Sequence, residues 1–161
     1  MSSGRSVTFT HAICRAPAAS VVDGLRAEDR GAPDAGVFRT EPAAYVAALE
    51  AAGVAVTVLE PLEAFPDSVF VEDPALILDG VAIVLRPGAP SRAGEAAALR
   101  PALEAQCDGV MDLASGLVDG GDILCTDDTV MVGLSARTDR DGIAALTPLV
   151  ERLGYRLALV E

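Results

Sequence analysis

Acidic residues gather in two short segments of the chain, at a spacing typical of sites that bind a cation. The first segment, residues 65–73, reads FPDSVFVED and holds Asp67, Glu72 and Asp73 just before an apolar run. Carboxylates directed into a pocket bind a guanidinium by charge-assisted bidentate hydrogen bonds, because its planar donors match their geometry better than an ammonium does. The same residues also suit a solvated turn that caps a strand, so the sequence leaves both interpretations open.

The second acidic segment reads LVDGGD and places two acids around two glycines, as Asp119-Gly120-Gly121-Asp122. Glycine adopts positive φ angles without steric cost, so these glycines would let the backbone approach a ligand closely. A turn at the start of a hairpin is the alternative interpretation, and the residues alone do not favour either one.

Three arginines are candidates for binding a carboxylate. Arg86 and Arg92 lie in one loop, and Arg137 lies in a later loop that follows a similar apolar segment. A guanidinium binds a carboxylate in bidentate fashion, although a single surface arginine more often only covers apolar surface with its stem. If the two loops are equivalent parts of a repeat, Arg92 and Arg137 would point toward a common centre.

The remaining reactive side chains give no recognisable catalytic or metal pattern. The single histidine, His11, lies in an apolar segment, where a structural or edge position is the more common one. Cys14, Cys107 and Cys125 have neither an adjacent histidine nor CxxC spacing, which argues against zinc and thioredoxin-type sites. We therefore expect no metal site and three free thiols that pack as small apolar residues.

Length and composition limit the class of protein. The 161 residues, 51% of them hydrophobic, predict one folded domain. The net charge of −12 repels polyanions, so we expect no nucleic-acid partner and an attraction for small cations. Charges interrupt every long apolar stretch, so we expect no membrane span, and the odd cysteine number without a signal peptide favours the cytoplasm.

Hydrophobic periodicity and turn residues predict alternating strands and helices, which indicates an α/β fold. Pro42 suits the first turn of a helix, and Asp79-Gly80 is the strongest hairpin signal in the chain. The predicted strands are residues 7–14, 54–59, 75–78, 81–85, 123–125, 130–134 and 155–160, and the predicted helices are residues 41–52, 94–105 and about 141–153.

An internal repeat organises these elements. Two copies share one order of features: Glu72-Asp73 in the first or Gly121-Asp122 in the second, then two strands joined by a turn, an arginine and a glycine-led helix. Gly94 and Gly142 are separated by roughly 48 residues. The opening segment AICRAP is similar to AIVLRPGAP at residues 82–90, so the chain holds two full units and the end of another. Solenoids and propeller-like rings repeat in this way, and we expect the final strand, residues 155–160, to begin a further unit.

Five ordered motifs resemble the N-terminal part of the dimethylarginine dimethylaminohydrolase family, within the guanidino-group-modifying superfamily. They are THAICRAP at residues 10–17, FPDSVFVEDPAL at 65–76, RPGAPSR at 86–92, DGGDIL at 119–124 and VGLSART at 132–138. The resemblance covers nearly the whole chain. It implies that residues 1–161 form a single partial α/β propeller of about three ββαβ-type repeats, from a ring that is fivefold in the complete family fold.

The resemblance also implies an activity and a small cationic substrate. Members of the family hydrolyse Nω-methylated arginine to citrulline and methylamine or dimethylamine, with a cysteine nucleophile and a histidine that transfers protons, and without a cofactor. By this resemblance Asp67, Glu72 and Asp73 would hold the substrate guanidinium. Arg92 and Arg137 would fix its α-carboxylate.

The resemblance implies two further residue roles. It also implies that this chain lacks some of the family's catalytic residues. Leu25 would lie in a mobile lid and offer a backbone carbonyl to the substrate amine. Asp119 would orient the catalytic histidine, which in the family lies, like the nucleophilic cysteine, in repeats beyond Glu161. We therefore expect this chain alone to be inactive, and to be completed by missing C-terminal repeats or by a homodimer that covers its exposed edges.

Two alternative functions fit the same residues. The acids suit any guanidinium, so a related amidino hydrolase or deiminase acting on arginine or another guanidine is one alternative. A non-catalytic protein that binds guanidines is the other, because the recognition residues are present and the reactive ones are not.

Overall fold

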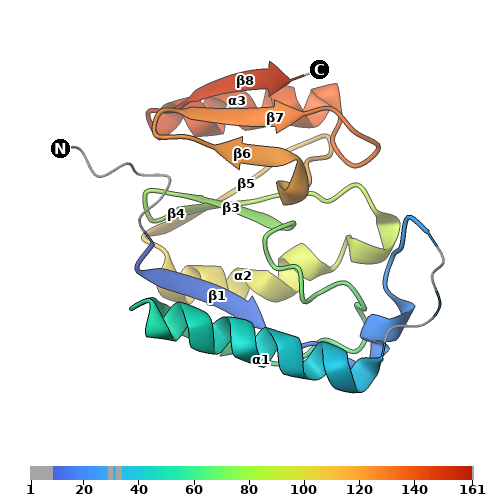
Figure 1. Ribbon diagram of the computed structural model, residues 1–161. Helices are drawn as coiled ribbons and strands as arrows, with labels where there is room; N and C mark the ends of the chain where they lie inside the picture. The colour runs from blue at the N-terminus through green and yellow to red at the C-terminus, as the bar shows by residue number, and fades with distance from the viewer. Residues whose placement is uncertain (1–8, 29–30, 32–33, 161) are drawn as a thin grey trace. The chain divides into compact units, whose positions relative to one another are not determined.

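A computed structural model describes residues 9–28, 31 and 34–160 of the chain, and the α/β fold class is confirmed (Figure 1). The chain divides into two compact units, Phe9–Val71 and a second unit described from Glu72 onward. The strands form three separate sheets of two, three and three strands. No closed ring is present within the described ranges, so the propeller stays a prediction.

The first unit is a strand, a helix and a parallel strand. β1 (His11–Arg15) pairs in parallel with β2 (Ala55–Leu59), and α1 (Ala35–Ala51) connects them. A short 3₁₀ helix, η2 (Ala19–Asp23), follows β1. This unit corresponds to the last three elements of the repeat, as the similarity of its opening segment predicts.

The predicted start of the first helix is wrong by about two turns. The side chain of Asp34 accepts hydrogen bonds from the backbone N–H groups of Gly36 and Val37, so the helix begins at Ala35 rather than near Glu41. Pro42 therefore lies inside α1. A strong N-terminal cap explains why the helix extends past the position where proline alone would place its first turn.

The second unit confirms the repeat, because two segments share one topology (Figure 1). In each, an antiparallel hairpin is followed by a helix and by a strand parallel to the hairpin's second strand. The first segment is β3 (Ala75–Leu78), β4 (Val81–Val84), α2 (Glu95–Gln106) and β5 (Gly109–Asp112); the second is β6 (Ile123–Cys125), β7 (Thr129–Gly133), α3 (Arg140–Arg152) and β8 (Arg156–Val160). The hairpin at Asp79-Gly80 is confirmed, with φ angles of 47° and 81° that suit a type I′ turn.

Two strand predictions are corrected by this topology. β5 was not predicted, since GVMD carries little β-propensity and becomes a strand by pairing with β4. β8 does not begin a further unit. It pairs in parallel with β7, from Thr129↔Arg156 to Gly133↔Val160, and so closes the second repeat.

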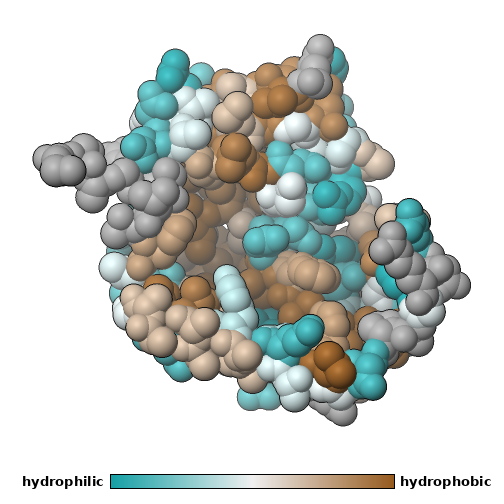
Figure 2. Space-filling model, viewed as in Figure 1, coloured by the Kyte–Doolittle hydropathy of each residue, from teal (hydrophilic) through white to brown (hydrophobic). Residues whose placement is uncertain are grey.

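Apolar residues from both repeats build one core in the second unit. Its members, all at most 8% exposed, are Leu76, Leu78, Ile83, Leu85, Leu113, Val118, Val130, Val132, Ile143, Leu146, Val150 and Tyr155. Other apolar side chains of this unit are exposed, and Figure 2 shows apolar surface over β6, β7 and β8. Leu124 on β6 is 62% exposed, and Leu159 and Val160 on β8 are 39% and 44% exposed.

The described helices are too short or too polar to cross a membrane. The longest of them, α1, has 17 residues.

Candidate functional site

The backbone of the second unit brings the two acidic segments together. Gly120 N donates a hydrogen bond of 2.9 Å to the carbonyl oxygen of Asp73. A Cβ at Gly120 would lie 2.1 Å from the carbonyl oxygen of Glu72, so only glycine allows this approach. Gly120 therefore serves a close contact between two backbone segments, and this contact places Asp73 beside Asp119.

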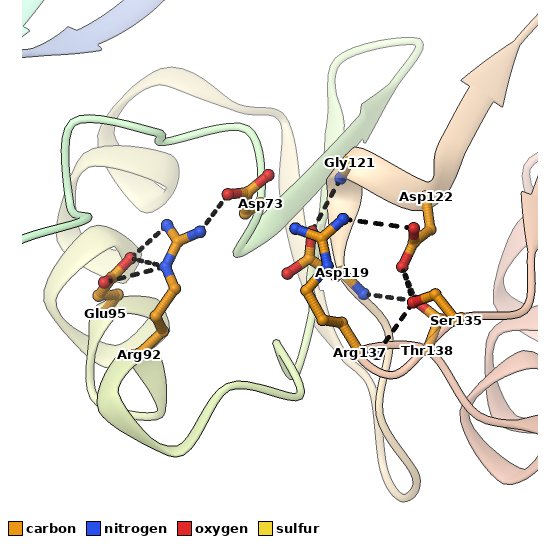
Figure 3. Close-up of polar contacts among 9 residues, drawn as sticks. All are labelled: Asp73, Arg92, Glu95, Asp119, Gly121, Asp122, Ser135, Arg137 and Thr138. Carbon is orange, nitrogen blue, oxygen red and sulfur yellow. Dashed lines mark hydrogen bonds and ion pairs between the residues drawn. The ribbon is translucent and has the colours of Figure 1, made fainter. Parts of the chain in front are cut away.

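Three charged side chains converge on the exposed backbone at Gly121 (Figure 3). A Cβ built on this residue would lie 3.1 Å from Asp119 Oδ1, 3.3 Å from Asp73 Oδ1 and 3.4 Å from Arg137 Nη2. The absence of a side chain keeps this small polar surface open. We call the set Asp73, Asp119, Gly121 and Arg137 the Gly121 cluster.

Asp119 is the most deeply buried member of the Gly121 cluster, with no exposed surface. Its Oδ1 accepts a hydrogen bond of 3.1 Å from Gly121 N and lies 3.4 Å from Arg137 Nη1. Its Oδ2 has no hydrogen-bond partner within the described part of the chain. Burial and the charge of Asp73 raise the pKa of Asp119, so this carboxylate oxygen is poised to accept a hydrogen bond from a further donor.

The backbone around Asp119 is fixed by side chains from the start of α3. Asp119 N donates to Thr138 Oγ1 at 3.0 Å. Asp139 Oδ1 accepts hydrogen bonds from Leu117 N at 3.0 Å and Gly142 N at 2.7 Å, and these bonds hold the pKa of Asp139 below its ordinary value. One carboxylate thus caps the helix and ties it to the segment that carries Asp119.

Arg137 is the accessible cation of the Gly121 cluster, with 45% of its side chain exposed. Besides Asp119, it faces Asp122, whose Oδ1 lies 3.4 Å from Nη2. Ser135 Oγ and Thr138 Oγ1 donate to Asp122 Oδ2 at 2.6 and 2.7 Å. Burial opposes ionisation of Asp122, but these hydrogen bonds and the charge of Arg137 outweigh it and lower the pKa of Asp122.

A second, fully buried ion cluster adjoins Asp73 (Figure 3). Arg92 is 4% exposed, and its Nη1 donates to Asp73 Oδ2. Its Nε and Nη2 donate to the carboxylate of Glu95 at distances from 2.6 to 3.1 Å. Burial alone would lower the pKa of Arg92, yet the hydrogen bonds to Glu95 and Asp73 raise it, so the guanidinium stays charged.

Two more predicted site residues meet in the first unit. Leu25 N donates to both carboxylate oxygens of Asp67, at 3.0 Å to Oδ1 and 3.3 Å to Oδ2. Asp67 is 7% exposed, whereas the side chain of Leu25 is 61% exposed. A Cβ at Gly24 would lie 2.8 Å from Asp67 Oδ1, so glycine gives Asp67 access to the Leu25 backbone.

Other candidates lie apart from these clusters. The side chain of Glu72 is exposed, and Arg86 Nε donates to Gly116 O at 3.0 Å in a contact between two loops. His11 is exposed, with one ring nitrogen 3.0 Å from Thr10 Oγ1.

The three cysteines lack the features of an activated nucleophile. All three are free and partly buried. Burial raises the pKa of Cys14, Cys107 and Cys125, and the charge of Asp108 adds to the effect at Cys107. Nucleophilic cysteines have a lowered pKa. No group of histidine, cysteine and acidic residues in the described ranges is arranged to hold a metal ion.

Sequence reasoning did not include three residues that shape these clusters: Glu95, Ser135 and Thr138. Glu95 stands three positions after Arg92 at the start of a helix, which is a recognisable ion-pair spacing. Ser135 and Thr138 lie within the motif VGLSART, but neither hydroxyl was assigned a role, because a hydroxyl becomes informative only once its hydrogen-bond partner is known.

Sequence comparisons match the chain to one family. A family model described as "N,N dimethylarginine dimethylhydrolase, eukaryotic" matches residues 36–161. The N(G),N(G)-dimethylarginine dimethylaminohydrolase of Pseudomonas aeruginosa is 40% identical over 154 residues, which are 94% of this chain and 61% of the relative. The protein of the same name from Streptomyces coelicolor is 36% identical over 151 residues, 92% of this chain and 58% of the relative.

Solved structures agree with these matches. A mutant of the P. aeruginosa enzyme complexed with citrulline has a TM-score of 0.92 at 39% identity, covering 95% of this chain and 61% of that chain. The N-terminal domain of the arginine dihydrolase ArgZ has a TM-score of 0.80 at 16% identity, covering 92% and 56%, and shares the fold alone. The chain thus spans less than two thirds of the relatives it matches. The matches take in both acidic segments and both arginine-bearing loops, and the chain belongs to the dimethylarginine dimethylaminohydrolase family.

Proposed function

We propose that the protein hydrolyses Nω-methylated arginine to citrulline and methylamine or dimethylamine, and that this chain supplies the substrate-binding part of the enzyme. The observation that carries the proposal is the Gly121 cluster, in which two buried carboxylates and one accessible guanidinium face an open glycine. With Asp122 and Glu95, four carboxylates surround two arginines here (Figure 3). The surplus of negative charge suits a cationic ligand.

Within this proposal the substrate guanidinium is held by acids. Asp73 uses Oδ2 for Arg92, and its Oδ1 lies on the side of Gly121, where a planar cation would meet it. Asp67 and Glu72 are the two further acids that the family resemblance assigns to this role. A buried carboxylate is costly without a cationic partner, so the acids would favour a guanidinium over a neutral ligand.

The α-carboxylate of the substrate would be held by Arg137 and Arg92. Arg137 is accessible and its ion-pair distances of 3.4 Å are long, so it can turn to a new carboxylate at little cost. Leu25 would contribute its backbone carbonyl to the substrate amine from the lid segment. The bond from Leu25 N to Asp67 shows that Leu25 and this acid lie together within the first unit.

Proton transfer would depend on Asp119 acting through a histidine that lies outside these 161 residues. Asp119 Oδ2, which has no hydrogen-bond partner among the residues that the structure describes, is a suitable acceptor for an imidazole N–H. The raised pKa values of the three cysteines and the exposed position of His11 support the proposal that this chain alone is inactive.

Further repeats of an α/β propeller, or a second copy of the chain, would then complete the enzyme. The exposed apolar residues Leu124, Leu159 and Val160 support this, because a covering layer would remove them from water.

The experiment that tests the proposed function compares asymmetric dimethylarginine with unmethylated arginine as substrates of the full-length protein. We expect citrulline and dimethylamine from dimethylarginine, and a kcat/KM for arginine that is lower by orders of magnitude. The isolated 161-residue chain should release no citrulline. Ammonia release from arginine at a comparable kcat/KM would indicate a deiminase, and turnover of neither compound would contradict hydrolysis.

A further inference from the structure

We infer that Glu95 is a positioning residue, which holds the guanidinium of Arg92 in the orientation that meets the carboxylate of the ligand. The inference rests on the proposed function, in which Arg92 contributes to carboxylate binding. It adds a residue that the family resemblance does not assign to the site.

The carboxylate of Glu95 binds one edge of the Arg92 guanidinium, the edge formed by Nε and Nη2. Glu95 is the first residue of α2 and is 3% exposed. Its two carboxylate oxygens accept from Arg92 Nε at 3.1 and 3.0 Å, and its Oε2 also accepts from Nη2 at 2.6 Å. Asp73 meets the opposite corner through Nη1, so acids on two sides fix the plane of the Arg92 guanidinium (Figure 3).

The second arginine of the proposed site is held quite differently. Arg137 is 45% exposed, and its carboxylate partners lie 3.4 Å from its nitrogens. The orientation of the buried Arg92 guanidinium is therefore set before the ligand arrives, while Arg137 adjusts to the ligand. Ordering a long side chain in advance lowers the entropy cost of binding.

Stability alone is a weak reason for a carboxylate in this position. Replacing a buried ion pair by apolar residues of similar volume is often neutral or stabilising. Glu95 is also not the N-terminal cap of α2, since that position is Gly94, which has no side-chain cap bond. Glu95 does fix the orientation of the Arg92 guanidinium, because it binds both Nε and Nη2.

The test measures how much of the affinity depends on the ligand's carboxylate. Citrulline and its decarboxylated analogue N-carbamoylputrescine are titrated calorimetrically into the full-length protein and into its Glu95→Gln variant. We expect the preference of the variant for citrulline to fall about tenfold, with the affinity for N-carbamoylputrescine unchanged. Glu104→Gln is the matched control, because Glu104 lies on the same helix, is exposed and is ion-paired with Arg100. Its preference should equal that of the wild type.

Two outcomes would overturn the inference. An unchanged preference in Glu95→Gln would show that Glu95 does not act through Arg92. An equal weakening of both ligands, together with a lower Tm, would show a structural role only. If Glu95→Gln does not fold, Glu95→Asp keeps the charge on a shorter stem and should show a smaller loss of preference than tenfold. If the wild-type protein binds neither ligand, the proposed function itself fails.

Discussion

Replacing Asp119 by asparagine should lower the turnover of the full-length enzyme by about 10³-fold or more, while the fold and ligand binding persist. A carboxylate that orients a catalytic histidine contributes on this scale when it is replaced by an amide, because the imidazole adopts the wrong tautomer. Asparagine can keep the bond from Gly121 N through its amide oxygen, so the local backbone should not change. Steady-state kinetics and calorimetric binding of citrulline separate the two effects.

Asp119→Asn lowers turnover, but it should raise thermal stability at neutral pH. The pKa of Asp119 is raised in the folded protein, so the folded state holds its proton to a higher pH than the unfolded chain does. Ionisation of Asp119 therefore lowers the free energy of unfolding. The loss begins as the pH rises through the ordinary pKa of an aspartate, and it is complete above the raised pKa of the folded state. In the 161-residue chain, where no described residue pairs with Asp119 Oδ2, Asp119→Asn should match the wild-type Tm in acid and exceed it at neutral pH, as thermal denaturation across pH 3 to 8 would show.

Asp127→Asn is the control for the Asp119 experiment, since Asp127 is an exposed acid in the turn between β6 and β7. This variant should keep wild-type turnover. If Asp119→Asn loses citrulline binding as severely as turnover, Asp119 contacts the ligand or supports the fold, and its role toward a histidine is contradicted.

Replacing Gly120 by alanine should destabilise the protein by about 3 kcal/mol or more and remove ligand binding. The added Cβ would lie 2.1 Å from the carbonyl oxygen of Glu72 and 3.1 Å from Asp73 Cα. These contacts are with backbone, which cannot rotate away, so the two acidic segments must separate. Their separation breaks the bond from Gly120 N to Asp73 O and moves Asp73 away from Gly121.

Gly133→Ala provides the matched control for this second variant. A Cβ at Gly133 would have Asp122 O at 3.8 Å as its only neighbour within 4 Å, which is an ordinary contact. Urea denaturation should therefore give nearly wild-type stability for Gly133→Ala and a large loss for Gly120→Ala. A stable Gly120→Ala protein that still binds citrulline would contradict the close approach on which the Gly121 cluster depends.

The repeat could be predicted from the sequence because its signals are local. Asp79-Gly80 has the backbone freedom that a tight hairpin needs, and the helices carry apolar residues at helical spacing. β5 could not be predicted in the same way. Its residues Gly109–Asp112 have no pattern of their own, and only the partner strand β4 makes them a strand.

The charged residues of the candidate site could be named from the sequence, but the residues that they contact could not. Asp119 and the two glycines stood out by type and spacing, and the structure places Asp119 and Gly121 with Asp73 and Arg137. The sequence could not show that Gly120 serves a backbone contact, because that contact joins segments far apart in the chain. Nor could it show that Arg92 is held by Glu95 as well as Asp73, since burial decides which of several acids an arginine meets.

The most direct measurement is a crystal structure of the full-length protein with citrulline bound. We predict the ureido group of citrulline within hydrogen-bonding distance of Asp73, beside Gly121, and the citrulline carboxylate facing Arg137. In the same structure Asp119 Oδ2 should accept a hydrogen bond from a histidine outside these 161 residues. Citrulline bound elsewhere, with the Gly121 cluster empty, would contradict the assignment of this cluster as the substrate site.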